Sequence, residues 1–249
     1  MTLAETLLSL QLSEESIHQR LHQIHQDALA GSRYLREPNF TRIHSPDLEF
    51  LFRAYDERFF GGLCRQTLAD RQLGFRLAPR MTRTGGTTTR FRDRATGAVS
   101  FEIAIAIGVL FDSFRDGDRR ITVCGLECED RLQALQRVFE HELVHLAEQL
   151  CWETSDCKAA RFQEIAARLF LHRAHTHSLI TRQERAAQSG IRPGSRVAFA
   201  FEGCRLTGRV NRITKRATVL VEDGSGVRYS DGLRYKTYYV PISSLEPLA

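Results

Sequence analysis

The sequence lacks any long hydrophobic run. In its 249 residues, no apolar stretch approaches the roughly 18 to 20 residues that cross a bilayer. The N-terminal segment MTLAETLLSLQLSEES contains a short apolar stretch, but no basic region precedes it and no cleavage site is evident, so we expect no signal peptide. These absences predict a cytoplasmic protein that does not associate with membranes, and they leave association with the nucleoid open.

Paired cysteines, internal repeats and low-complexity segments are also missing. Six cysteines are scattered along the chain and none belongs to a CxxC pair. In a reducing compartment we expect most of them to be buried thiols, with one a candidate metal ligand. A composition of 42% hydrophobic and 26% charged residues excludes bulk disorder, and the length suffices for one core, or for one core plus a small module.

Positive charge is concentrated at the C-terminal end of the chain. Residues 190–249 contain ten basic and five acidic residues, which accounts for the whole net charge of +5, so residues 1–189 are neutral. A neutral body with a basic module indicates that the module meets an anionic partner such as nucleic acid. The same composition also fits a small domain without any such partner.

The first three quarters of the chain show the pattern of an α+β domain preceded by a helical arm. We expect the arm over residues 1–45 and the domain over residues 46–187. We expect Ser45 to cap a helix that begins at Pro46 and is stopped by Gly61-Gly62, because proline suits the first helical position and glycine suits a helix end. Hydrophobic periodicity then predicts a small antiparallel sheet, with extended stretches over residues 72–78, 81–93 and 98–106. It also predicts two helices, one from about Asp130 to Trp152 and one from about Lys158 to Leu171.

The pattern changes after the turn-rich segment QSGIRPGSR, and residues 191–249 read as a separate all-β module. Five short β-rich runs separated by Glu-Gly and Asp-Gly pairs predict a small SH3-like barrel, since closure removes exposed strand edges. Aromatic residues alternate with arginines along these runs, which is typical of nucleic-acid-binding barrels. Arg209, Arg212 and Arg216 are the candidate phosphate contacts, although a barrel that buries its aromatics needs no ligand.

The segment HELVH, residues 141–145, carries the clearest chemical signal. On a helix, His141 and His145 lie one turn apart on the same face, which lets both imidazoles reach one zinc ion. Glu142 is then placed to take a proton from a zinc-bound water as a general base. The surrounding residues have the apolar periodicity of a helix, with neither glycine nor proline between residues 129 and 152. The segment therefore predicts a zinc site of the metallopeptidase kind.

The order of segments resembles the SprT-like domain of the Spartan-type zinc proteases, which degrade proteins crosslinked to DNA. The resemblance rests on LFRAYDERFFGGL, RMTRTGG, EIAIAIGVLF and the HELVH helix, and covers roughly residues 46–182. It implies a zinc metalloendopeptidase with an α+β core of helix, small sheet, HExxH helix and following helix. Its two histidines and its glutamate correspond to His141, His145 and Glu142. An edge strand beside such a site can bind extended substrate by β-augmentation, and residues 98–106 are a candidate for this role.

The third metal ligand departs from the family pattern. In that family it is a histidine four residues before a phenylalanine, at the start of the next helix. The matching phenylalanine is Phe162 and the matching position holds Lys158, whose protonated amine cannot bind zinc. Three substitutes are available: the neighbouring thiol of Cys157, Glu164 on the next helix as in thermolysin-like zincins, and His172 at the far end of that helix.

These observations lead to one expected function and to two alternatives. We expect a zinc metalloprotease of SprT-like type acting on protein bound or crosslinked to DNA, with the basic C-terminal module contacting DNA. The departure at Lys158 motivates an alternative, in which the fold has lost catalysis and serves as an adaptor for nucleic acid or protein. Retention of Glu142 favours the enzyme, since an adaptor needs no general base. A zinc peptidase unrelated to DNA is the third interpretation.

Overall fold

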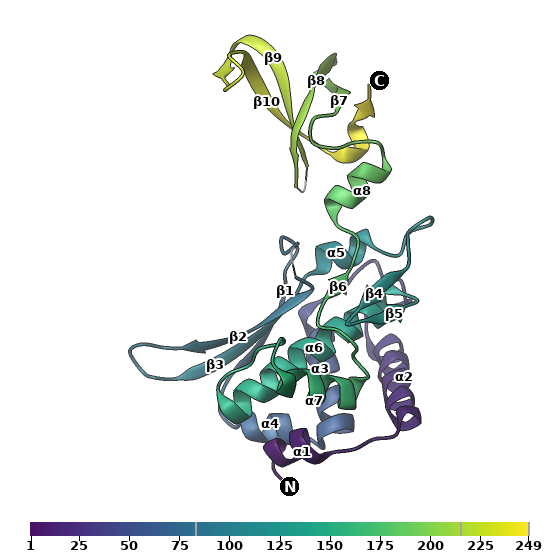
Figure 1. Ribbon diagram of the computed structural model, residues 1–249, viewed down its shortest axis with the longest axis vertical. Coiled ribbons are helices and arrows are strands. Elements are labelled where there is room, and N and C mark those ends of the chain that lie inside the picture. Colours follow the sequence, from purple (N-terminus) through teal and green to yellow (C-terminus); the bar gives the residue numbers. More distant parts are fainter. Residues whose placement is uncertain (83, 215, 249) are drawn as a thin grey trace. The chain divides into compact units, whose positions relative to one another are not determined.

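The computed structural model describes residues 1–82, 84–214 and 216–248 (Figure 1). Residue 83, inside the RMTRTGG segment, and residues 215 and 249 of the basic C-terminal region lie outside the described residues. The chain forms two compact units, residues 1–179 and residues 180–249. Both mix helices with strands, so the expected α+β class is confirmed. None of the helices among the described residues is long and apolar enough to cross a membrane.

Four helices open the first unit. The second of them begins where the Ser13 side chain accepts a hydrogen bond from the backbone N–H of Ser16. The third has Pro46 in its first turn, but its N-cap is His44, so the expected cap at Ser45 was wrong. It ends at Gly61, whose φ of 58° is the left-handed conformation that glycine adopts without strain. Residues of the expected N-terminal arm, including Leu7 and Ile24, are fully buried. The helices are α1 (Leu3–Ser9), α2 (Glu14–Gly31), α3 (Ser45–Phe60) and α4 (Leu63–Leu68).

A three-stranded sheet follows, with strand order β1-β3-β2, formed by β1 (Leu73–Leu77), β2 (Gly86–Arg92) and β3 (Val99–Ile105). The hairpin pairs β2 antiparallel to β3, whereas β1 pairs parallel to β3. The expectation of a wholly antiparallel sheet was therefore wrong. The most apolar strand, β3, occupies the centre of the sheet, so β1 pairs with the edge of β3 that β2 leaves free. The central position of β3 also makes its edges unavailable to substrate, and β2 is an edge strand instead.

The long helix α6 (Arg131–Trp152) forms the core of the first unit. Asp130 caps its first turn by accepting a hydrogen bond from the N–H of Gln133. All its apolar residues from Leu132 to Leu146 are fully buried. Around it lie α5 (Ile107–Asp112), α7 (Ala160–Phe170) and a second small sheet of order β5-β4-β6, with β4 (Ile121–Val123), β5 (Leu126–Cys128) and β6 (His177–Ser178). The helix predicted from about Asp130 to Trp152 is thus present.

The second unit is a five-stranded antiparallel sheet of order β10-β9-β8-β7-β11. One face packs Val197, Phe199 and Val219 against Ala186 and other apolar residues to form a small core. No pairing joins β10 to β11 within residues 180–214 and 216–248, so the sheet is open and the expected closed barrel was wrong. The last strand has two residues, too few to bridge the gap. The elements are α8 (Arg182–Gln188), β7 (Arg196–Phe201), β8 (Cys204–Ile213), β9 (Ala217–Arg228), β10 (Arg234–Val240), a 3-10 turn η1 (Ile242–Ser244) and β11 (Glu246–Pro247).

Candidate metal centre

Helix α6 presents its two histidines to each other one turn apart. Nε2 of His141 lies 3.2 Å from Nε2 of His145. Two nitrogens bound to one tetrahedral zinc ion lie about 3.3 Å apart, so this separation suits a shared metal. Phe162 of α7 packs against both rings, with centroid distances of 4.9 Å to His141 and 4.5 Å to His145. The phenylalanine singled out from the sequence therefore packs against both imidazole rings.

Buried hydrogen bonds orient the His145 ring. Its Nδ1 lies 2.7 Å from Oγ of Ser155, and that hydroxyl donates to Oε2 of Glu148 at 2.5 Å. Because the hydroxyl proton goes to the carboxylate, Ser155 accepts from Nδ1–H of His145, and Nε2 keeps a free lone pair. Glu148 is fully buried and receives a second bond from Nε of Arg161 at 2.6 Å. A carboxylate that fixes a histidine tautomer is the usual outer support of a metal ligand.

The His141 ring is oriented in a similar way by a thiol. Its Nδ1 lies 3.9 Å from Sγ of Cys124, and that thiol donates to the carbonyl oxygen of Arg137 at 3.7 Å. The sulfur is then free to accept from Nδ1–H of His141, which leaves Nε2 as an acceptor facing Nε2 of His145. Burial, with His145 as the next cause, lowers the pKa of His141 to about 2. Burial also lowers the pKa of His145, so both rings are neutral, as metal ligation requires.

The structure brings one of the three proposed third ligands to this pair. The ligand atoms of His141, His145 and Cys157 all lie within 4.8 Å of one another. Cys157 belongs to the turn that precedes α7, which begins only at Ala160, and this turn directs the neighbouring Lys158 outward, where it is exposed. Two imidazoles and a thiolate are a donor set that zinc favours over magnesium or calcium.

The other two proposed third ligands lie elsewhere. Glu164 is exposed on α7, where it lines a cavity with Arg161, Arg168 and the N-terminal Leu8. His172 follows α7 and is buried, but it joins a different group of side chains, described below. Neither Glu164 nor His172 therefore belongs to the group formed by His141, His145 and Cys157.

Glu142 occupies a closely packed pocket beside strand β2. The Thr88 hydroxyl lies 2.9 Å from Oε2 of Glu142 and 2.8 Å from its carbonyl oxygen. Burial raises the pKa of Glu142 to about 7, while the bond from Thr88 works in the opposite direction. A Cβ atom at Gly86 would lie 2.8 Å from Cγ and Oε1 of Glu142, and one at Gly85 would lie 2.9 Å from the His177 ring. The paired glycines are thus needed for close approach, a role that their sequence position alone did not reveal.

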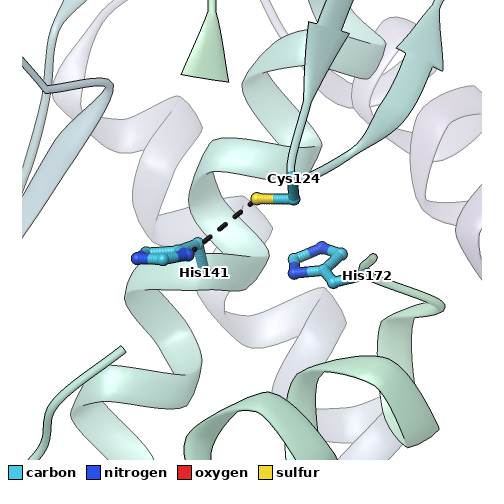
Figure 2. Close-up of side chains that lie close together, drawn as sticks. All are labelled: Cys124, His141 and His172. Carbon is cyan, nitrogen blue, oxygen red and sulfur yellow. Dashed lines mark hydrogen bonds between the residues drawn. The ribbon is translucent and has the colours of Figure 1, made fainter. Parts of the chain in front are cut away.

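A second group lies on the other side of His141. Figure 2 shows Cys124, from the turn between β4 and β5, facing His141 on α6 and His172 beyond α7. The ligand atoms of these three buried residues all lie within 4.8 Å of one another. Burial raises the pKa of the Cys124 thiol well above its ordinary value. This buried group could bind a metal ion such as zinc. Sequence reasoning missed Cys124, because no spacing rule connects it to the HELVH helix.

The candidate nucleic-acid contacts lie in the second unit. Arg209 and Arg212 are exposed on β8, and Arg216 is exposed just before β9. Nη2 of Arg209 lies 3.7 Å from Oδ2 of Asp231, so part of its charge is already offset. The three arginines therefore lie within eight residues of one another in the sequence, and Arg209 has a carboxylate nearby.

Comparison with protein-family models, with curated proteins and with solved structures found no match to this chain.

Proposed function

We propose that this chain is a zinc-dependent metalloendopeptidase of SprT-like type, with His141, His145 and Cys157 as metal ligands and Glu142 as general base. The observation that carries the proposal is the 3.2 Å separation of the two Nε2 atoms, each left unprotonated by its outer hydrogen bonds. Two neutral acceptors at this distance repel each other unless a cation lies between them. Cys157 adds a soft donor to the same group.

The chemistry divides between the metal and the chain. A zinc ion bound here would polarise a peptide carbonyl and lower the pKa of a coordinated water towards about 7. Glu142 accepts the proton of the attacking water and returns it to the leaving amine, for which a pKa of about 7 is well matched at neutral pH. Thr88 holds one carboxylate oxygen of Glu142, so the other is free for proton transfer. Ser155 and Glu148 keep the His145 ring in the ligating orientation.

Strand β2 is the candidate substrate-binding element. It is one of the two edge strands of the β1-β3-β2 sheet, and it contributes Thr88 to the pocket of Glu142. An extended peptide could pair with the free edge of such a strand and so bring its backbone alongside the general base. This arrangement favours an unfolded or extended protein segment as substrate.

The basic second unit supports a substrate that is associated with DNA. The whole net charge of +5 belongs to residues 190–249, and Arg212 and Arg216 are exposed there. The adaptor alternative was motivated by Lys158, and the proximity of Cys157 to the two histidines favours the enzyme over it.

The test is cleavage of a DNA-binding protein by the zinc-loaded full chain, with and without DNA, beside the Glu142→Gln variant. Cleavage that requires both zinc and Glu142 supports the peptidase. A dependence on DNA supports the substrate class. A zinc-loaded chain that cleaves no protein under any of these conditions contradicts the proposal.

A further inference from the structure

Both ring nitrogens of His141 face groups of metal-binding side chains. Nε2 faces His145, and Nδ1 faces Sγ of Cys124 at 3.9 Å. The peptidase proposal uses only the Nε2 side, so it leaves the Cys124 side without a chemical role beyond orienting the ring. The group on that side contains a second histidine, His172, which the peptidase proposal does not use either.

His172 has the surroundings of a metal ligand. It is 5% exposed, and its Nε2 lies 2.9 Å from Oε2 of the fully buried Glu140. A carboxylate that accepts from one ring nitrogen leaves the other nitrogen unprotonated and directs it to a metal. That other nitrogen, Nδ1, is buried and has no hydrogen-bond partner among the described residues. A buried polar atom without a partner is unfavourable, and a coordinated cation would satisfy it.

The backbone holds Cys124 firmly beside the segment that carries His172. The carbonyl oxygen of Cys124 accepts from the N–H groups of Arg173 and Ala174, at 2.9 and 3.1 Å, and its own N–H donates to the carbonyl oxygen of Thr176 at 2.9 Å. Cys124 also has a φ of 53°, a left-handed conformation that costs a cysteine more than it costs glycine or asparagine. The backbone that carries the thiol is thereby held beside the segment that carries His172.

Charge on the neighbouring residues suits a cation at this position. Besides the bond to His172, the buried carboxylate of Glu140 accepts from the Tyr55 hydroxyl at 2.6 Å and from Nη1 of Arg137 at 3.1 Å, and the Arg137 pair already offsets part of its charge. A divalent ion brings two positive charges, and a thiolate would offset one of them, with Glu140 close by to offset part of the other. Sulfur and imidazole donors select zinc, cobalt or copper over magnesium and calcium.

We propose that His141 is shared between two metal sites, and that Cys124, His141 Nδ1 and His172 Nδ1 form the second one for an ion of the zinc class. Binding releases the thiol proton of Cys124 as the sulfur–metal bond forms. Nδ1 of His141 must also give up its proton. When the first site is empty, that proton moves to Nε2, and when the first site is filled, it leaves the protein and the imidazolate bridges both ions. The second site therefore binds its ion more readily when the first site is empty, because no imidazolate has to form. This inference does not require that the chain cleaves anything.

The experiment removes the first site and looks for the second in the full-length chain. The double variant His145→Gln/Cys157→Ser lacks two of the three ligands of the first group but keeps Cys124, His141 and His172. Titration with cobalt(II) alone is the probe, because a cysteine thiolate bound to cobalt produces a charge-transfer absorption band in the near ultraviolet. We expect one equivalent of cobalt to bind with this band, and we expect the band to disappear when either Cys124→Ser or His172→Gln is added.

Two matched variants keep the result interpretable. Cys128 is a buried thiol in the same hairpin that belongs to neither group, so Cys128→Ser should leave the band unchanged. Cys124→Gly removes the thiol with a residue that suits the left-handed backbone, which guards against loss of folding in Cys124→Ser. If the double variant is poorly folded by circular dichroism, the single variant Cys157→Ser serves the same purpose, because Cys124 is then the only thiol of either group.

The proposal is overturned if the folded variant binds no cobalt, if the band survives Cys124→Gly, or if Cys128→Ser removes it equally. Failure here would leave the peptidase proposal intact, since wild-type cleavage is not the readout. Conversely, an inactive wild-type chain that still shows the Cys124-dependent band would contradict the peptidase proposal alone.

Discussion

A Cβ atom placed on Gly86 would lie 2.8 Å from Cγ of Glu142, closer than real side chains approach one another. We therefore expect Gly86→Ala to displace the proposed general base without touching the metal ligands. A misplacement of about 1 Å can reduce catalysis about 10²-fold. Peptidase assays should show this loss while zinc content stays unchanged. Gly74→Ala, in β1 of the same sheet, is the control, because its Cβ would meet only the Phe101 carbonyl at an ordinary 3.8 Å. Equal loss in both variants would contradict the prediction.

Replacement of Glu142 by glutamine should keep the fold and the metal but remove proteolysis. Glutamine has the same shape and can still contact Thr88, yet it cannot accept a proton, so the rate should fall by about 10²-fold or more. Elemental analysis and a peptidase assay on the same preparation measure both properties. A variant that cleaves at the wild-type rate would show that Glu142 is not the base.

The third ligand can be tested by comparing neighbouring residues. If Cys157 is a direct ligand as proposed, Cys157→Ser should weaken zinc binding more than ~10²-fold, beyond the effect typical of a lost outer hydrogen bond. Glu164→Gln and Lys158→Ala should have no effect, since both side chains are exposed away from the two histidines. Competition with a chromogenic chelator gives the affinities. If Glu164→Gln weakened binding as strongly as Cys157→Ser, the assignment of Cys157 would fail.

Outer support of His145 should be measurable as well. Ser155→Ala removes the hydroxyl that connects Nδ1 of His145 to Glu148, and loss of such a partner typically costs about 10- to 100-fold in metal affinity or activity. Thr154→Ala is the matched control, because Thr154 is exposed and its hydroxyl donates to the Trp152 carbonyl at 3.4 Å, while its carbonyl, which accepts from Arg161, is kept in the variant. Equal zinc affinity in Ser155→Ala and wild type would mean that the tautomer of His145 is set by something else.

Binding of duplex DNA by the full chain should weaken steeply with salt if the exposed arginines contact phosphates. Each contact contributes about −0.9 to the slope of log affinity against log salt concentration, so Arg212→Ala and Arg216→Ala should each reduce the slope by about one. Arg205→Ala should change it less, because Arg205 already pairs with Glu246 at 2.5 Å. Arg209, near Asp231, should fall between these cases.

A protein partner for the second unit predicts a different outcome. Affinity would then depend little on salt, and Tyr238→Ala would have the largest effect, because its ring packs against Phe201 at 5.0 Å and Phe199 at 5.5 Å. Absence of DNA binding at low salt would remove nucleic acid from the role of this unit.

The sequence by itself determined the features that depend on neighbours along the chain. The apolar periodicity around HELVH is enough to make α6 a helix, and a helix places His141 and His145 one turn apart whatever surrounds it. Proline and glycine likewise marked the start of α3 and its end at Gly61. These outcomes follow from local backbone geometry, which the sequence specifies directly.

Only the tertiary structure decided features that depend on which distant segments meet. The parallel pairing of β1 with β3 arises because the apolar β3 takes the centre, and alternation within a strand does not specify its neighbour. Alternating residues in the second unit fit a barrel as well as an open sheet covered on one face, and the two-residue β11 leaves the sheet open. The sequence favoured Cys157 but left Glu164 and His172 open as alternatives, and it is the turn before α7 that brings Cys157 to the two histidines. Cys124 could not be identified at all, because it reaches His141 through a turn that is fixed by the backbone of residues 173–176.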